Sequence, residues 1–418
     1  MSADNKVPEI RFKGFSREWQ ENYLGNLIEI RSAARVHKEQ WTEVGVPFFR
    51  TSDVVSIYKG QENNKAYISH AVYQELSEKI GKVTKGDLFI TGGGAIGIPY
   101  LVPNDEPLYF KDADLLWLKN NKKFDGYFLY SFFFSEPFKK YIKSITHIGT
   151  IAHYTIEQAK ATPINICEIK EQVTISNFLK KTDNLINQHQ QKYDKLSNIK
   201  KAMLEKMFPK QGETEPEIRF KGFSGEWEEN ILGDQMTVTS VKRILQSDWT
   251  QSGVRFLRAR DIVSAYKNEL PSDYLYISRE KYNEYSQLSG KVNIGDLLVT
   301  GVGTIGVPLL ITNNEPVYFK DGNIIWFKNE NKIDGMFLFY SFISDQIQTY
   351  IKHSAGIGTV GTYTINSGKN TPIQLPTREE QAAIGNYFQK LDILINQHQQ
   401  QITKLNNIKQ ACLSKMFV

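Results

Sequence analysis

Cysteine-rich segments, long apolar runs and paired prolines are all missing from this 418-residue sequence, and each absence excludes a class of protein. The only two cysteines, Cys167 and Cys412, cannot form a disulfide framework or a metal cluster, which is typical of a reducing cytosol. The longest apolar runs, such as residues 127–134, are far too short to span a bilayer, and the N-terminus lacks the apolar core of a signal peptide. We therefore expect a soluble, cytoplasmic protein.

The short motifs that mark common enzymes are also missing. The sequence contains no G-x-x-x-x-G-K-[ST] phosphate loop, no H-E-x-x-H and no G-x-S-x-G. Without a proline pair, it also lacks the Asn- or Asp-Pro-Pro-aromatic tetrad that resembles an amino-methyltransferase site. The glycine-rich segments 92–97 and 301–306 have dinucleotide-binding spacing, but a proline and an apolar run follow where a phosphate-binding helix should begin. We interpret them as loops between two strands, whose threonines could offer hydroxyls to a phosphate.

The sequence does contain an internal repeat, in which one module occurs twice. PEIRFKGFSREW at residues 8–19 returns as PEIRFKGFSGEW at 216–227, and YFKDADLLWLKN at 109–120 returns as YFKDGNIIWFKN at 318–329. All six tryptophans fall into repeat pairs. Two copies of one module can close on each other about a pseudo-two-fold axis.

Each module ends in a long helical stretch, at residues 171–208 and again at the end of the chain from residue 380. In both stretches a narrow stripe of mostly apolar residues recurs at three- and four-residue steps and is flanked by Lys, Gln and Asn. This is the pattern of a coiled coil. His189 and His398 lie on that stripe, where a polar residue commonly fixes the register. The predicted stripes are Thr182, Ile186, His189, Tyr193, Leu196, Ile199, Met203 and Met207, and Leu391, Ile395, His398, Ile402, Leu405, Ile408, Cys412 and Met416. We expect the two helices to pack on each other.

The rest of each module predicts an α+β domain. Strand-like pieces at 47–50 and 54–58, and at 254–257 and 262–266, precede a polar helix at 69–79 or 278–287. An aromatic-rich helix begins near Asp125 or Asp334, and its aromatic side chains are expected in the core. The segment 209–217 has the composition of a linker.

A formal charge of +5 permits a nucleic-acid partner without requiring one. Basic residues gather early in each module, where the two copies diverge most, and two Gly/Thr-rich loops offer hydroxyls and an aromatic ring. Such side chains can reach base edges and phosphates. The alternative is that these segments are solvated loops whose sequence is free to vary. Arg258 and Arg260 alternate along an expected strand, so that both would project from one face. The candidate contacts are Arg31, Arg35, Lys38, Arg50, Thr91, Gly93, Thr150, His153 and Tyr154 in the first module, and Lys242, Arg243, Arg258, Arg260, Thr300, Val302, Thr359, Thr362 and Tyr363 in the second.

Taken in order, these segments resemble the specificity (S) subunit of type I restriction-modification systems. The resemblance is carried by the paired Pro-Glu-Ile-Arg-Phe entries, the Gly-x-Gly-x-Ile-Gly strands, the Thr-Pro-Ile to Glu-Gln junctions and the Lys-Met-Phe helix ends, and it covers essentially the whole chain twice. At the first junction Cys167-Glu-Ile stands where Pro376-Thr-Arg precedes the second Glu-Gln.

The resemblance implies two pseudo-symmetric target-recognition domains, each a twisted β-sheet plus helices, separated by two long helices that form an antiparallel coiled coil. The implied bounds are 1–170 for the first domain, 171–208 for the central helix, 209–217 for the linker, 218–379 for the second domain and 380–418 for the last helix. A ~38-residue helix is roughly 57 Å long, enough to hold two domains over half-sites ~34–36 Å apart.

The resemblance also implies partners. It predicts a non-catalytic subunit that reads a bipartite target on double-stranded DNA, with two modification (methyltransferase) subunits docked on its helices and ATP-dependent restriction subunits joined through them, in a system of adenine methylation and phage defence. S-adenosylmethionine, ATP and Mg²⁺ would be bound by those partners and no cofactor or metal by this chain. The alternatives are a stand-alone DNA-modifying enzyme and a coiled-coil assembly scaffold.

Overall fold

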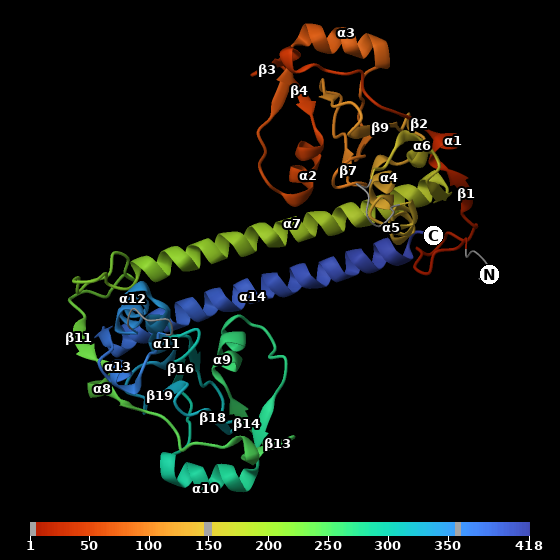
Figure 1. Cartoon of the computed structure of the whole chain (residues 1–418). Helices are drawn as coiled ribbons and strands as arrows, with labels where there is room; N and C mark the ends of the chain where they lie inside the picture. Colours follow the sequence, from red (N-terminus) through yellow and green to blue (C-terminus); the bar gives the residue numbers. More distant parts are fainter. Residues whose placement is uncertain (1–5, 146–152, 356–360) are drawn as a thin grey trace. The chain divides into compact units, whose positions relative to one another are not determined.

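A computed structural model describes residues 6–145, 153–355 and 361–418, and it divides the chain into two compact units (Figure 1). Unit 1 comprises Met1–Gln190 with Gln400–Val418, and unit 2 comprises Gln191–Gln399. Each unit therefore contains one globular domain and a part of both long helices. The domain bounds implied by the resemblance stay a prediction.

Unit 1 contains three sheets: β1-β10, β2-β9-β6-β7 and β3-β5-β4-β8. All strand pairs are antiparallel except β4 with β8. Its elements are β1 (Gln20–Tyr23), α1 (Leu24–Leu27), β2 (Glu29–Arg31), η1 (Lys38–Gln40), β3 (Trp41–Thr42), β4 (Val46–Phe49), α2 (Thr51–Lys59), β5 (Ala66–Ile68), α3 (His70–Ile80), β6 (Leu88–Thr91), β7 (Pro99–Leu101), β8 (Tyr109–Phe110), β9 (Leu115–Lys119), α4 (Gly126–Phe132), α5 (Glu136–Ile145), α6 (Ile156–Lys160) and β10 (Pro163–Ile166), followed by the first long helix, α7 (Ile169–Lys206).

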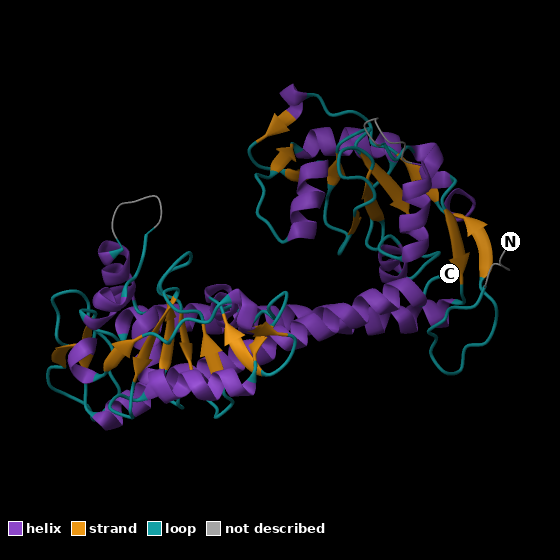
Figure 2. Ribbon diagram, turned by 60° about the horizontal axis from the view of Figure 1, so that its bottom comes forward, coloured by secondary structure: helices purple, strands orange, loops and turns teal. Residues whose placement is uncertain are grey.

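Unit 2 repeats this order and sheet topology. Figure 2 shows that both globular domains combine strands with helices. Its sheets are β11-β20, β12-β19-β16-β17 and β13-β15-β14-β18. Its elements are β11 (Glu228–Ile231), α8 (Leu232–Gln235), β12 (Thr237–Thr239), η2 (Gln246–Asp248), β13 (Trp249–Thr250), β14 (Val254–Leu257), α9 (Ala259–Tyr266), β15 (Leu275–Ile277), α10 (Arg279–Ser289), β16 (Leu297–Thr300), β17 (Pro308–Leu310), β18 (Val317–Phe319), β19 (Ile324–Lys328), α11 (Gly335–Ile343), α12 (Asp345–Ser354), α13 (Ile365–Lys369) and β20 (Pro372–Leu375), followed by the second long helix, α14 (Arg378–Lys415).

Two of the predicted strands are helices. Residues 54–58 lie in α2 and residues 262–266 in α9, because an Asp three residues after the cap accepts from the cap's backbone N–H and so fixes the first turn. The predicted polar helices are present as α3 and α10, each capped by a serine hydroxyl, of Ser69 or Ser278. The glycine-rich segments lie between antiparallel strands, as predicted.

The predicted aromatic helix is two helices in each unit, α4 with α5 and α11 with α12. Asp125 caps α4 by accepting from the backbone N–H groups of Tyr127 and Phe128. The aromatic rings of α4 lie in the main core of unit 1, with Phe128 and Phe132 almost wholly buried. The prediction that these aromatics build the core is therefore confirmed.

The Glu-Gln pairs at the junctions have a structural role that the sequence pattern did not reveal. Gln172 accepts from the backbone N–H of Asp125 at 3.1 Å and donates to the carbonyl of Cys167 at 2.9 Å. Gln381 makes the same two bonds in unit 2, to Asp334 at 3.0 Å and to Pro376 at 2.9 Å. The turn is thus held alike in both units although Cys167 stands where Pro376 does.

Each unit brings the beginning of one long helix against the end of the other, so α7 and α14 pack antiparallel. In unit 1 the Nζ of Lys409 lies 2.6 Å from Asp183, and in unit 2 the Nζ of Lys200 lies 2.6 Å from Asp392. The predicted stripe is wrong at Ile408, which is 37% exposed, because the neighbouring Lys409 turns toward α7.

The ends of the long helices complete the globular cores. Phe417, just beyond α14, packs against Trp19 and Phe128 with ring centroids 6.2 and 5.2 Å apart. Phe208, just beyond α7, packs likewise against Trp227 and Phe337 at 6.1 and 5.7 Å. The core of each unit therefore contains a ring that follows the long helix of the other module.

Replacing these rings should destabilise one unit at a time. Removing a buried Phe side chain costs about 3–5 kcal/mol, so Phe417→Ala should open unit 1 and Phe208→Ala unit 2. Both cysteines lie in the core of unit 1, and burial raises the pKa of each thiol, so neither reacts while that core is closed. We expect Phe417→Ala to speed the labelling of Cys167 by a thiol reagent, as located by mass spectrometry.

Two controls sharpen this test. Ile408→Ala removes an exposed apolar side chain from the same helix and should leave the labelling rate near that of the unaltered protein. Phe208→Ala should lower stability in urea without speeding the labelling of Cys167. Equal acceleration by Phe208→Ala and Phe417→Ala would contradict the assignment of one ring to each core.

Candidate nucleic-acid interface

The threonines of the glycine-rich loops are buried and bonded within those loops. Thr91 is 0% exposed; its hydroxyl donates to the carbonyl of Ala95 and accepts from the backbone N–H of Ile98 at 2.9 Å. Thr300 makes the same two bonds, to Thr304 and from Val307 at 2.9 Å. These hydroxyls shape the loop and are not presented to a ligand, which corrects the suggestion that they contact a phosphate.

The second pair of predicted loops lies directly against the first. The backbone N–H of Tyr154 donates to the carbonyl of Gly92 at 2.8 Å, and His153 forms a β-bridge with Gly93. Tyr154 itself is 1% exposed and its hydroxyl bonds Thr162, so its ring belongs to the core, whereas His153 is exposed.

Unit 2 repeats this arrangement. Tyr363 is 2% exposed and its hydroxyl bonds Thr371, while Thr362 is exposed and Val302 is half-buried. Thr150 and Thr359 lie outside the described residues. Gly93 is buried and Val302 half-buried, so His153 and Thr362 are the candidates of these loops that are exposed, one in each unit.

Arg50 and Arg258 are the capping residues of α2 and α9. The guanidinium of Arg258 bonds Asp261 through Nε at 2.8 Å and Nη2 at 2.9 Å, and these contacts raise its pKa. Arg50 makes the same pair with Asp53, at 2.9 and 3.1 Å. Because Asp53 and Asp261 are themselves buried, these arginines stabilise the helix starts.

Arg258 and Arg260 do lie together, but not on a strand. Arg260 is in the first turn of α9, and both guanidinium groups bond the carboxylate of Asp273, at 2.8 and 2.6 Å. The hydrogen bond from Arg258 is the main reason why the pKa of Asp273 is lowered. The side chain of Arg260 is 59% exposed, so it is the arginine of this pair that a phosphate can approach.

The remaining basic candidates lie at the end of β2 or in the segment between β2 and β3 in unit 1, and between β12 and β13 in unit 2. Arg31 is at the end of β2, where it donates to the carbonyl of Ile80 at 2.7 Å and pairs with Glu29 at 2.7 Å. Lys242 lies over the ring of Tyr285, 4.4 Å from its centroid. Arg35, Lys38 and Arg243 are exposed.

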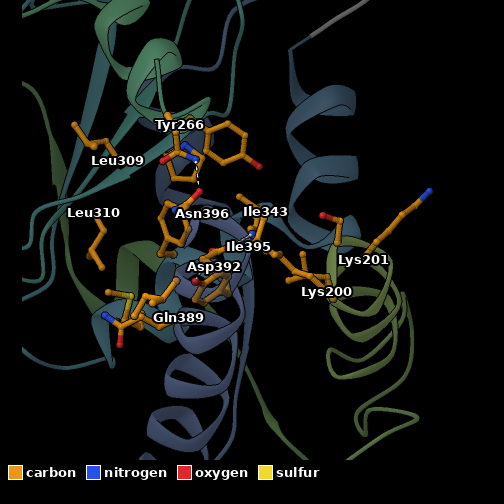
Figure 3. A pocket seen from close by; sticks show the side chains of 18 of the residues that line it. Lys200, Lys201, Tyr266, Leu309, Leu310, Ile343, Gln389, Asp392, Ile395 and Asn396 are labelled. Carbon is orange, nitrogen blue, oxygen red and sulfur yellow. Dashed lines mark hydrogen bonds and ion pairs between the residues drawn. The ribbon is translucent and has the colours of Figure 1, made fainter. Parts of the chain in front are cut away.

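One cavity lies within unit 2, where α9, β17 and α11 meet the two long helices (Figure 3). Its volume is about 930 Å³, and Lys200, Tyr340 and Asp392 form a bonded group on its wall, with Asp392 accepting from Lys200 at 2.6 Å and from Tyr340 at 2.7 Å. Burial and Asp392 raise the pKa of Tyr340, so it stays a neutral donor. Asn268 reaches Asn396 of α14 at 3.2 Å.

In unit 1 two aromatic rings lie at the corresponding positions. Tyr58 stacks on Phe134 with ring centroids 5.7 Å apart, where unit 2 has Tyr266 and the smaller Ile343. The Tyr–Asp–Lys group is present there too, as Tyr127, Asp183 and Lys409. The cavity is thus a junction between the domain and the long helices, held by side chains that bond one another.

The buried carboxylates of the described residues are engaged in structural bonds. Asp87 accepts from the indole N–H of Trp117 at 3.0 Å, and Asp296 from that of Trp326 at 2.9 Å. Glu171 and Glu380 are each bound by two nitrogens of Arg11 or Arg219. In residues 6–145, 153–355 and 361–418 no group of three His, Cys, Asp or Glu side chains is placed to hold a metal ion, and no helix there is long and apolar enough to cross a membrane.

Comparison with known proteins identifies one protein family. A family model described as the type I restriction modification DNA specificity domain matches the chain twice, over residues 16–198 and 226–407. The type I restriction enzyme MjaVIII specificity subunit of Methanocaldococcus jannaschii is 30% identical over 318 residues, which cover 72% of this chain and 71% of that protein.

Solved structures share the fold. The crystal structure of a type I restriction-modification system S subunit from M. genitalium covers 99% of both chains with a TM-score of 0.57 and 15% identity. A structure described for complex assembly and conformational transition of the type I R-M system has a TM-score of 0.50 and 16% identity, over 94% of this chain and 96% of the other.

The two arginines at the start of α9 should differ in what they do for stability. Arg258→Ala leaves the buried Asp261 without its cation and should lower the free energy of unfolding by roughly 3 kcal/mol. Arg260→Ala removes only an exposed pair and should cost less than ~1 kcal/mol. Urea denaturation of the two single variants tests this. Equal losses would show that Arg258 has no special structural role, and the double variant would mix both effects.

Proposed function

Because the chain belongs to the type I restriction-modification DNA specificity family, we propose that it is the non-catalytic subunit that chooses the DNA target for a multi-subunit enzyme. Each globular domain reads one half of a bipartite sequence on double-stranded DNA. The two long helices set the spacer between the halves and dock two modification subunits, and restriction subunits join through those. The partner subunits bind S-adenosylmethionine, ATP and Mg²⁺, and the complex acts in the cytoplasm.

The observation that carries this proposal is a shared framework with unlike surfaces. The two domains have the same sheets, the same buried Arg–Glu pair and the same helix caps. Their exposed polar segments differ, as in RSAARVHKEQ at residues 31–40 against TSVKRILQSD at 239–248. One framework presenting two different surfaces is what a protein needs to read two different half-sites.

The chemistry of the described side chains supports a binding role rather than catalysis. The buried carboxylates, a group type that many enzymes use as a general base, accept hydrogen bonds here from arginines, indoles or backbone amides, and those bonds hold the fold. Exposed lysines and arginines would neutralise phosphates, and exposed polar side chains on the loops would discriminate bases. The match to the specificity family does not favour the alternative of a stand-alone modifying enzyme.

The long helices fit the docking role because most of their outward positions remain polar and exposed. Lys181, Lys192 and Lys195 of α7 and Lys404 of α14 are exposed. A scaffold that used the helices alone would not need two domains of the same fold with different loops, so we favour DNA recognition over pure assembly.

Exchanging domains tests the proposal. Residues 1–170 are replaced by the matching segment of the second module, and the complex with its modification subunits is assembled. We expect the altered complex to select a target whose two halves are the same sequence in inverted orientation, as measured by sequencing the duplexes it retains from a randomised pool. The unaltered complex should select two different halves. Retention of the original asymmetric target by the exchanged protein would overturn the assignment of one half-site to each domain.

A further inference from the structure

A short turn lies beside the glycine-rich loop in each unit, and neither it nor its side chains were among the candidates drawn from the sequence. In unit 1 this Lys-Asp turn is residues 111–114, between β8 and β9, and in unit 2 it is residues 320–323, between β18 and β19. The signal was visible in the repeat, because Asp114 and Asn323 differ within segments that are otherwise closely alike.

The backbone around the turn is the same in both units. The N–H of Gly92 donates to the carbonyl of Asp114 at 2.8 Å, and the carbonyl of Gly92 accepts from Tyr154 at 2.8 Å. In unit 2 Gly301 takes the same two partners, Asn323 at 2.8 Å and Tyr363 at 2.9 Å. Three segments far apart in the sequence are thereby fixed against one another before any ligand binds.

The third residue of the turn shows how strictly the backbone is kept. Gly322 has φ of 70°, a left-handed conformation that glycine adopts without strain. Ala113 has φ of 63° at the same place, although this conformation is unfavourable for a residue with a Cβ. The turn therefore has the same shape in both units despite a local cost in unit 1.

The side chains on this shared backbone differ. In unit 1 the Nζ of Lys111 lies 2.6 Å from the carboxylate of Asp114, and the two side chains are 45% and 39% exposed. Unit 2 has Asn323 in place of the carboxylate and an exposed Lys320. Among the described residues no acidic side chain forms an ion pair with Lys320.

The neighbouring loops change together with the turn. A Cβ added to Gly93 would lie 3.3 Å from the Oδ1 of Asp114, so the missing side chain leaves room for that carboxylate over the loop. Unit 2 has Val302 at this position, directly after Gly301, whose N–H donates to the backbone carbonyl of Asn323. The exposed His153 is likewise replaced by the exposed Thr362.

Carboxylate and amide read different base edges. A carboxylate only accepts hydrogen bonds, so it favours the amino group of cytosine or adenine, whereas an asparagine amide can donate to and accept from a single adenine. The ion pair with Lys111 offsets the charge of Asp114, which lowers the repulsion from a nearby phosphate backbone.

We propose that Asp114 and Asn323 are specificity-determining residues, each reading one base pair in the half-site of its own domain. This inference rests on the proposed function, since it assumes that each domain reads one half-site. Gly93 and Lys111 position Asp114, whereas Lys320 is left available to a phosphate beside Asn323.

The test is a reciprocal exchange of one functional group. Asp114→Asn and Asn323→Asp conserve side-chain shape, and each is assembled with the modification subunits and offered a randomised pool of DNA duplexes. Asp114→Asn should change the base preference at one position of one half-site by about tenfold, the size expected for one bidentate base contact. Asn323→Asp should change one position of the other half-site.

Asp112→Asn is the matched control, because it removes the same charge from the same turn at a position where both units have aspartate. It should leave both half-sites unchanged. Equal melting temperatures for the three variants and the unaltered protein would show that folding is intact.

The outcomes separate the inference from the proposed function. Selection of two half-sites by the unaltered complex, with the same target selected by both exchange variants, would overturn the inference and leave the proposed function standing. An equal loss of affinity for every sequence would also overturn it, since that result indicates a phosphate contact. Selection of no preferred sequence by the unaltered complex would remove the proposed function itself.

Discussion

The fold depends on the burial, in a globular core, of a phenylalanine ring that follows the end of each long helix. Phe417 lies among Trp19, Phe128 and Phe132 in unit 1, and Phe208 lies among Trp227, Phe337 and Phe388 in unit 2. A ring of this size contributes several kcal/mol when it is buried, which is a large part of the stability of a typical domain. The core of unit 1 is thus completed only when the final residues of the chain are in place.

In both units two kinds of polar contact hold the entry segment, which begins with Pro-Glu-Ile-Arg-Phe, against the long helices. The backbone N–H of Ile10 donates to Lys415 at 3.1 Å, and that of Ile218 to Lys206 at 2.9 Å. The entry segment is also tied to the start of the long helix by the bidentate pairs Arg11–Glu171 and Arg219–Glu380, whose glutamates are 1% exposed. A buried pair of this kind adds little net stability over an apolar contact, but its loss on one side is costly. Its effect is to specify one arrangement of entry segment and helix.

Much of this organisation was predictable because it is repeated in the sequence. The duplication, the two long helices, the aromatic cores and the strand-to-strand glycine loops all follow from patterns of period and composition. The errors arose where one side chain decides the outcome. Residues 54–58 and 262–266 alternate like strands, yet Asp53 and Asp261 start helices there by accepting from the cap's N–H. Thr91 looked available for a ligand, but only coordinates reveal that its hydroxyl bonds within its own loop.

The sequence pattern drew attention to Arg258 and not to Asp114, again because single side-chain contacts are not visible in a sequence. Arg258 was conspicuous because it is basic and lies in a divergent region, but its guanidinium is bound to Asp261 and Asp273. Asp114 was inconspicuous because it lies in a well-matched segment and is acidic. A position that varies inside a fixed backbone is a stronger sign of recognition than one that varies inside a drifting loop, since only the former keeps a changed side chain in a defined place. In a protein whose buried polar groups are largely committed to its own framework, the partly exposed Asp114 and Asn323 are the side chains that we propose to distinguish one half-site from the other.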